Sequence, residues 1–158
     1  MLRTLILVIA SIGFIIVIGG ATYEHVSVVP VWSSAPPASL SMFQGDYPLS
    51  AWNFWMPIHP LNVILLLTSL ILNWNTERCK FILLTIGGYF LVLVATFIYF
   101  VPELMSIVQS SYSAVVDAEL TRRAKNWELF SLVRLGVIMI LAVSLLLGLS
   151  KSSDPKLA

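Results

Sequence analysis

Arg134 is the residue in this chain whose surroundings most need a chemical explanation. It lies within residues 126–141, a stretch that otherwise has the composition of a membrane-spanning helix. An arginine at the centre of such a helix costs roughly 2.5 to 3.5 kcal/mol on translocon scales, so it is usually paired, near an interface or beside a wet cavity. We therefore predict that a carboxylate contacts Arg134, with Glu24, Glu103 or both as its partners.

Other side chains able to do chemistry are expected at the same depth as Arg134. A helix rises about 1.5 Å per residue. His59 therefore lies roughly 22 Å from the cytoplasmic end of its helix at Trp74, and Arg134 roughly 24 Å from the cytoplasmic end of its helix at Ser150. Glu24 and Glu103 lie about 30 to 33 Å from the cytoplasmic ends of theirs. The sequence thus predicts one polar cluster at one end of a bundle, made of Glu24, His25, His59, Tyr99, Glu103 and Arg134.

The composition defines the broad class of the protein. The chain has 158 residues, of which 58% are hydrophobic and 11% are charged, well outside the range of soluble domains. This composition indicates an integral membrane protein. The net charge of +1 with scattered basic residues excludes nucleic-acid binding. Cys79 is the only cysteine, so an intrachain disulfide is excluded as well.

The elements that must position the cluster are long apolar runs. Those at 5–25, 58–74, 81–101 and 127–149 are each long enough to span a bilayer as a helix. They predict an all-α fold, with 1–158 forming one membrane domain that is an up-down-up-down bundle of four transmembrane helices. The connection at 26–57 is rich in proline and tryptophan, so we expect it to leave the helix and fold as an extracytoplasmic cap over the bundle.

The distribution of positive charge predicts the orientation in the membrane. The connection at 26–57 contains no lysine or arginine, which favours the outer side. Both termini are then cytoplasmic, with Arg3, Arg78, Lys80, Lys151 and Lys156 inside and Arg122, Arg123 and Lys125 outside.

Each predicted helix carries one stripe of polar or small residues. The second helix has His59, Asn62, Leu66, Ser69 and Asn73 at spacings of three and four, and such a face is hidden from lipid. The other helices give comparable stripes, which are Gly13, Gly20 and Glu24; Thr85, Gly88, Val92, Thr96, Tyr99 and Glu103; and Trp127, Ser131, Arg134 and Ile138. All four stripes are expected to face the interior of the bundle.

Short motifs along most of the chain resemble those of a known family. They are Tyr23-Glu24, VPVW at 29–32, PPASL at 36–40, PIHPL at 57–61, TFIYFVP at 96–102 and WELFSLVR at 127–134. In this order they resemble the anthrone-oxygenase-like family of small four-helix bacterial membrane proteins. His25 and His59 are where the chain departs from that family, although His59 lies inside the segment at 57–61.

The resemblance implies a bacterial inner-membrane oxygenase that needs no cofactor, neither metal nor flavin, and acts on an activated polycyclic phenol. A deprotonated, delocalised substrate can react with dioxygen directly, so the protein supplies a base, an anion-stabilising group and an apolar slot. His59 or His25 would be the base, and Arg134 with Tyr99 would hold the developing oxyanion. The expected ligand-binding residues are Trp55, Phe100, Trp127, Glu24, Glu103, Asn62 and Ser131.

Two other classes of function stay open at the level of sequence. His25, His59, Glu24 and Glu103 could ligate a metal, although Arg134 is a poor neighbour for a cation. Alternatively the protein is a non-enzymatic accessory or lipid-binding membrane subunit, in which the polar cluster only holds the bundle together. The expected partners are membrane lipid and an apolar aromatic molecule, and the sequence leaves the oligomeric state open.

Overall fold

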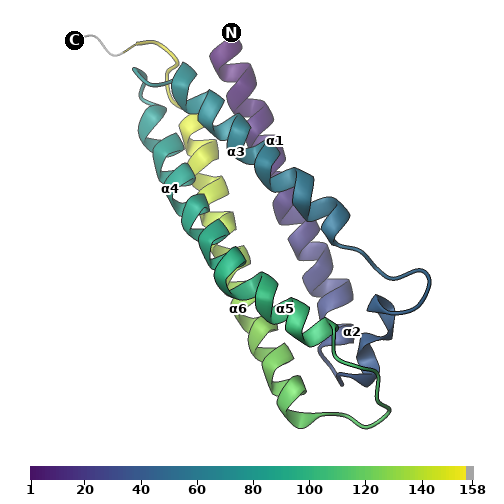
Figure 1. The fold of residues 1–158 in the computed structure, drawn as a ribbon. Helices are drawn as coiled ribbons and strands as arrows, with labels where there is room; N and C mark the ends of the chain where they lie inside the picture. Colours follow the sequence, from purple (N-terminus) through teal and green to yellow (C-terminus); the bar gives the residue numbers. More distant parts are fainter. Residues whose placement is uncertain (156–158) are drawn as a thin grey trace.

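A computed structural model of the chain describes residues 1–155, so Lys156 lies outside the described residues. The fold is all-α (Figure 1), and its described part contains four helices long and apolar enough to cross a membrane. The first and third of these are composite. One joins α1 (Leu2–Tyr23), a π-helical turn (Glu24–Val28) and α2 (Val29–Trp32), and the other joins α4 (Cys79–Ala95), a π-helical turn (Thr96–Phe100) and α5 (Val101–Val108). The second and fourth are α3 (Trp52–Leu72) and α6 (Ala118–Leu149).

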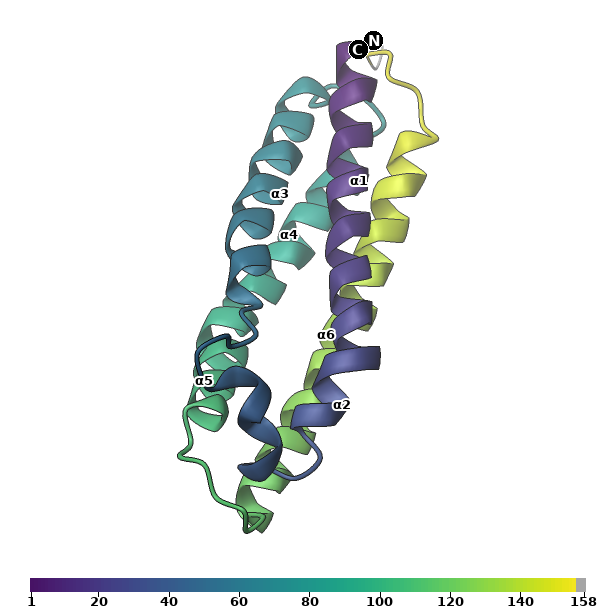
Figure 2. The ribbon, with the colours of Figure 1, turned by 90° about the vertical axis from the view of Figure 1, so that its right-hand side faces the viewer.

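The helices form an antiparallel bundle in which α1 packs on α3 and α6, and α4 packs on α6 and α3 (Figures 1 and 2). Glycine brings two of these pairs close together. A Cβ atom at Gly13 would meet the Asn62 side chain across the α1–α3 contact, and one at Gly88 would meet Leu141 across the α4–α6 contact. Small residues let membrane helices approach closely in this way, so α1 with α3 and α4 with α6 form two tight pairs.

All four helices are longer than the apolar runs predict. The first helix continues to Trp32 instead of ending at residue 25, and α3 begins at Trp52 instead of residue 58. The third continues to Val108 and α6 begins at Ala118, which corrects the expected bounds at 101 and 127. The irregular connection is therefore much shorter than 26–57, and it includes a 3₁₀ helix at Ala38–Phe43.

Proline does not end these helices as expected, because local backbone adjustments accommodate it. Pro30 and Pro102 each follow a π-helical turn, in which the N–H of Val29 bonds the carbonyl of Glu24 and the N–H of Val101 bonds that of Thr96. A proline lacks the N–H that a regular helix would use, and a π-helical turn redistributes the hydrogen bonds before it. Pro57 and Pro60 lie inside α3 without ending it.

Two apolar cores follow one another along the bundle. The inner core joins α1, α3, α4 and α6 around residues such as Phe14, Leu66, Tyr89 and Ile138. The outer core contains Val29, Trp32, Leu40, Phe100, Ile107, Leu120, Ala124 and Trp127, so the chain after α1 packs on α5 and α6. Between the cores lies the polar layer, which we define as Glu24, His25, Thr96, Ser131 and Arg134.

At the opposite end of the bundle, Arg78 connects three segments. Its Nε donates to the carbonyl of Lys151 at 2.9 Å, its Nη1 to Thr4 Oγ1 at 2.9 Å and its Nη2 to the carbonyl of Leu149 at 3.4 Å. The start of α1 and the end of α6 are thereby held beside the turn that joins α3 to α4. The arginines 122 and 123 lie at the other end, on the first turns of α6.

Candidate functional site in the polar layer

Arg134 is held by hydroxyl groups and an aromatic ring. Its Nη1 donates to Thr96 Oγ1 at 3.1 Å and its Nη2 donates to Ser131 Oγ at 2.9 Å. The guanidinium carbon lies 4.1 Å from the centre of the Phe100 ring, which is a cation–π contact. Within residues 1–155 no carboxylate forms an ion pair with Arg134, so the predicted direct contact with Glu24 or Glu103 was wrong. Glu24 is nevertheless close enough for its charge to act on the guanidinium.

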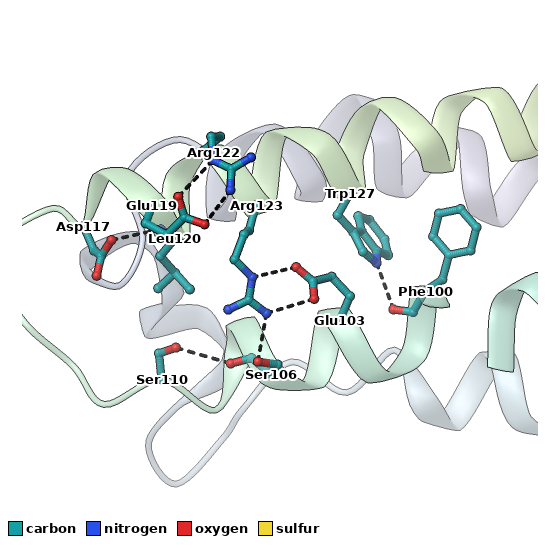
Figure 3. A network of polar contacts seen from close by, with 10 residues as sticks. All are labelled: Phe100, Glu103, Ser106, Ser110, Asp117, Glu119, Leu120, Arg122, Arg123 and Trp127. Carbon is teal, nitrogen blue, oxygen red and sulfur yellow. Dashed lines mark hydrogen bonds and ion pairs between the residues drawn. The ribbon is translucent and has the colours of Figure 1, made fainter. Parts of the chain in front are cut away.

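Glu103 instead pairs with Arg123, which was not predicted for the site (Figure 3). Arg123 Nε and Nη2 donate to the two Glu103 oxygens at 2.7 and 2.9 Å, and Nη2 also donates to Ser106 at 2.9 Å. This bidentate pair connects α5 to the first turns of α6. Glu103 therefore lies outside the polar layer, on the far side of Trp127, whose Nε1 donates to the Phe100 carbonyl at 2.9 Å.

His25 extends the layer from Ser131 to the first helix. Its Nε2 lies 3.0 Å from Ser131 Oγ, and its ring stacks on Trp127 with a centroid distance of 6.5 Å. Since Ser131 Oγ accepts from Arg134, its own hydroxyl is free to donate to Nε2. A continuous series of hydrogen bonds thus runs from His25 through Ser131 and Arg134 to Thr96.

His59 forms a second group just inside the layer. Its Nδ1 lies 2.7 Å from the Tyr89 hydroxyl, and its ring stacks on Trp55 at 5.3 Å between centroids and 18° between planes. Trp55 Nε1 in turn donates to Glu24 at 2.9 Å, which connects this group to the polar layer. His59 Nε2 has no hydrogen-bond partner in the described part of the chain, so it is available to a ligand.

Tyr99 lies on the outer surface, and the π-helical turn explains why. Its side chain is 36% exposed and packs on Phe130, whereas the neighbouring Phe100 is 7% exposed and faces Arg134. A π-helical turn contains one extra residue, which rotates everything after it relative to a regular helix. The predicted stripe is correct for Thr85 and Val92, which are buried. After Thr96 the predicted spacing no longer gives the buried face, so Tyr99 is exposed.

The remaining predicted residues have structural surroundings. Asn62 is 0% exposed, and its amide donates to the carbonyls of Gly13 at 3.3 Å and Ile58 at 3.0 Å, within the α1–α3 contact. Tyr89 was not predicted for the site, although its spacing of four from Thr85 and seven from Thr96 puts it on the same helix face.

The four candidate metal ligands do not converge. His25, His59, Glu24 and Glu103 contact different partners, and no three His, Cys, Asp or Glu residues among positions 1–155 are arranged to hold a metal ion. The geometry gives the metal alternative no support.

Two hollows lie on the bundle, and of the residues described above only Tyr89 lines one of them. A groove of about 190 Å³ between α3 and α4 is lined only by apolar and aromatic residues, and Tyr89 forms part of its wall. A larger hollow of about 450 Å³ lies between Pro37 and the connection at 110–117, at the outer end of the bundle. His59 is not among the residues that line either hollow, although its partner Tyr89 lines the groove.

These features define the class of the protein. The four long apolar helices identify an integral membrane protein with a helical bundle, in which a layer of polar side chains separates two apolar cores. No family model, no curated protein and no solved structure matches the chain.

Proposed function

We propose that the protein binds an apolar aromatic molecule with a weakly acidic hydroxyl or enol group, and that His59 receives the hydrogen bond from that group. One observation carries the proposal, namely that His59 is fixed between Trp55 and Tyr89 while its Nε2 has no partner within the described residues. Fixed ring orientation and a free nitrogen are what a binding or proton-accepting histidine requires.

The tautomer of His59 follows from this role. We assign the proton to Nδ1, which then donates to the Tyr89 oxygen and leaves the lone pair of Nε2 for the ligand hydroxyl. The flat Trp55 ring beside it offers a surface on which a second aromatic ring can stack. Arg134 supplies a positive charge that favours the ligand anion. The charge of Glu24 offsets it only in part, since no carboxylate within residues 1–155 lies at ion-pair distance from Arg134.

Binding of 2-naphthol tests this proposal, with 2-methoxynaphthalene as the probe that lacks the acidic proton. The protein in nanodiscs should bind 2-naphthol with a saturable component that empty nanodiscs lack. His59→Gln should weaken it about tenfold, the loss of about 1.4 kcal/mol expected for one hydrogen bond. His25→Gln is the comparison, since His25 is also fixed by its neighbours and has an unpartnered nitrogen, Nδ1, which is buried. Equal affinity for both probes, or equal effects of both substitutions, would contradict the assignment of His59.

A second candidate function is cofactor-independent oxygenation, and the position of Arg134 favours it. Removal of a proton from an anthrone gives a delocalised anion, and reaction with dioxygen converts its CH₂ group to a carbonyl, with one oxygen atom in the product and the other in water. His59 would accept the proton and Arg134 would stabilise the anion.

Dioxygen consumption with 1,8-dihydroxyanthrone tests the second candidate separately from binding. His59→Gln should abolish the enzyme-dependent rate and Arg134→Lys should weaken it less. If the probe binds and the rate equals that of empty nanodiscs, the protein is a binder and not an oxygenase. If neither probe binds, the accessory or lipid-binding role takes the place of both proposals.

We also propose that the protein resides in a bacterial inner membrane with both termini cytoplasmic and the 33–51 connection outside as a cap. The absence of lysine and arginine from that connection supports this orientation. Asp46→Cys and Ser153→Cys, each in a Cys79→Ser background, test it in intact cells. A membrane-impermeant thiol reagent should label position 46 only, and labelling of position 153 alone would show the inverted orientation.

A further inference from the structure

Ser69 and Asn73, at the end of α3, each have a buried polar atom that the protein leaves without a partner. Both residues are 0% exposed, and neither the Ser69 hydroxyl nor the Asn73 Oδ1 has a hydrogen-bond partner within residues 1–155. A buried polar group without a partner costs its full desolvation free energy, so nearly all such groups bond another protein group or an ordered water. Two of them at one place indicate a binding site for a small polar molecule.

The two unpartnered atoms lie on one face of α3. Asn73 follows Ser69 at a spacing of four, and its Nδ2 donates to the Ser69 carbonyl at 2.8 Å. This bond also fixes the orientation of the amide group, because Oδ1 in the same position would meet another acceptor. Oδ1 is therefore the unpartnered end of Asn73, on the same helix face as the Ser69 hydroxyl.

The packing of α1 on α3 brings a further polar side chain to this face. Asn62 donates to the carbonyl of Gly13, which sets these two residues level in the antiparallel pair of helices. Nine residues from that contact along each helix, Thr4 on α1 lies level with position 71, between Ser69 and Asn73. The Thr4 hydroxyl is therefore at the level of the two unpartnered atoms.

Arg78 joins this group from the turn that follows α3. Its Nη1 donates to Thr4 Oγ1 at 2.9 Å, and its backbone N–H donates to Thr76 Oγ1 at 3.2 Å. The Thr76 hydroxyl in turn donates to the Asn73 carbonyl at 2.8 Å. The guanidinium has more N–H donors than the three bonds it makes, and no carboxylate among residues 1–155 pairs with it. We call Thr4, Ser69, Asn73, Thr76 and Arg78 the Arg78 cluster.

We propose that Ser69 and Asn73 bind an ordered water molecule inside the bundle. The water donates to Asn73 Oδ1 and bonds the Ser69 hydroxyl. An anion cannot satisfy Oδ1, which needs a donor, and a cation would be repelled by the charge of Arg78 in the same cluster. Water both donates and accepts, so it is the small ligand that fits all of these groups. The site lies away from His59 and does not depend on the ligand proposed there.

Asn62 shows by contrast how a protein contact can fill such a site. Its Oδ1 also has no conventional hydrogen-bond partner in the described part of the chain. It lies against Gly13, however, because a Cβ atom added to that glycine would meet it. A Cα–H group is a weak donor at such a close contact between helices, so α1 occupies the place that a water would take.

Ser69→Ala distinguishes a hydrated site from a dry one by the sign of its effect on stability. If a water bonds the Ser69 hydroxyl, the substitution should raise the equilibrium constant for unfolding about fivefold in mixed micelles of sodium dodecyl sulfate and dodecyl maltoside. If the hydroxyl is dry, the substitution removes an unpaired polar group, so the constant should fall. A constant that falls or does not change would overturn the proposal.

Ser11→Ala is the matched control for this substitution. Ser11 is 5% exposed on α1, and its hydroxyl donates to the carbonyl of Leu7 in the same helix at 2.8 Å. Such a bond adds little to the stability of a helix, so the unfolding constant should change less than about twofold. Equal effects of the two substitutions would show that the lost volume and not a water explains the result, which would also overturn the proposal.

A crystal structure from a lipidic mesophase tests the site directly. It should show a water about 2.7 to 3.2 Å from Asn73 Oδ1 that also bonds Ser69 Oγ, and Asn73→Leu should remove this water. The proposal is refuted if the two atoms bond protein groups instead. It is equally refuted if ordered waters appear elsewhere in the bundle and not at this place.

Discussion

Arg78→Met should destabilise the protein strongly, although the residue lies far from the candidate site. Arg78 is only 6% exposed and makes three hydrogen bonds that join the turn before α4 to Thr4 and to the carbonyls of Leu149 and Lys151. Hydrogen bonds of a charged group contribute about 1.5 to 3 kcal/mol each. The Leu149 carbonyl is the last of α6 and that of Lys151 lies two residues beyond it, at the end where the helix dipole also favours a positive charge.

The expected loss is about 3 kcal/mol, less than the sum of three such bonds. The bond to Leu149 is long at 3.4 Å and counts least, and water near the end of the helices can replace part of the others. Arg78→Lys should lose about half as much, because an ammonium group keeps the charge and cannot span three acceptors.

Unfolding in sodium dodecyl sulfate and dodecyl maltoside mixed micelles, followed by circular dichroism, measures this loss. Lys80→Met is the control, since Lys80 lies nearby. Within residues 1–155 its charge contacts only the Phe81 ring, at 5.1 Å, a contact with an expected effect below about 1 kcal/mol. Hydrogen exchange should accelerate at residues 146–151 in Arg78→Met. If Arg78→Met costs no more than Lys80→Met, the three hydrogen bonds do not stabilise the fold as argued.

Two further predictions concern packing and charge pairing. In a double-mutant cycle on the free energy of unfolding, Glu103→Gln with Arg123→Met should show a coupling energy of about 1 kcal/mol. Glu103→Gln with Arg134→Met should be additive within about 0.5 kcal/mol. A coupling energy between Glu103 and Arg134 would contradict the pairing of Glu103 with Arg123. Gly13→Ala should lower the free energy of unfolding by about 1 to 3 kcal/mol, because the added methyl group would clash with Asn62 on α3. Gly87→Ala is the control, since its methyl group has open space and should not destabilise the protein. Equal effects of the two substitutions would refute the close α1–α3 contact.

The sequence predicts the spanning helices and their inward faces well, because hydrophobicity and helical periodicity are local properties. Asn62, Leu66, Ser69 and Asn73 share one stripe in the sequence and are buried together in the structure. The rise per residue also predicts that His25 and Arg134 lie at one depth, and in the structure both bond Ser131.

The details that the sequence does not predict depend on departures from a regular helix. Pro30 and Pro102 are visible in the sequence, yet their effect is a π-helical turn before each, which rotates Tyr99 outward and Phe100 inward. The partner of Glu103 was missed for a related reason. The third and fourth helices continue past the expected ends, and only this extension places Arg123 opposite Glu103.

Nitrogen NMR of the two histidines in nanodiscs tests the central claim most directly, with His59→Gln used to assign the signals. In the free protein, His59 should carry its proton on Nδ1 with Nε2 unprotonated. Saturation with 2-naphthol should then shift the Nε2 signal of His59 towards the protonated position and leave His25 unchanged. A His59 Nε2 that is already protonated in the free protein, or that does not shift while 2-naphthol is bound, would contradict the assignment of His59 as the group that receives the ligand.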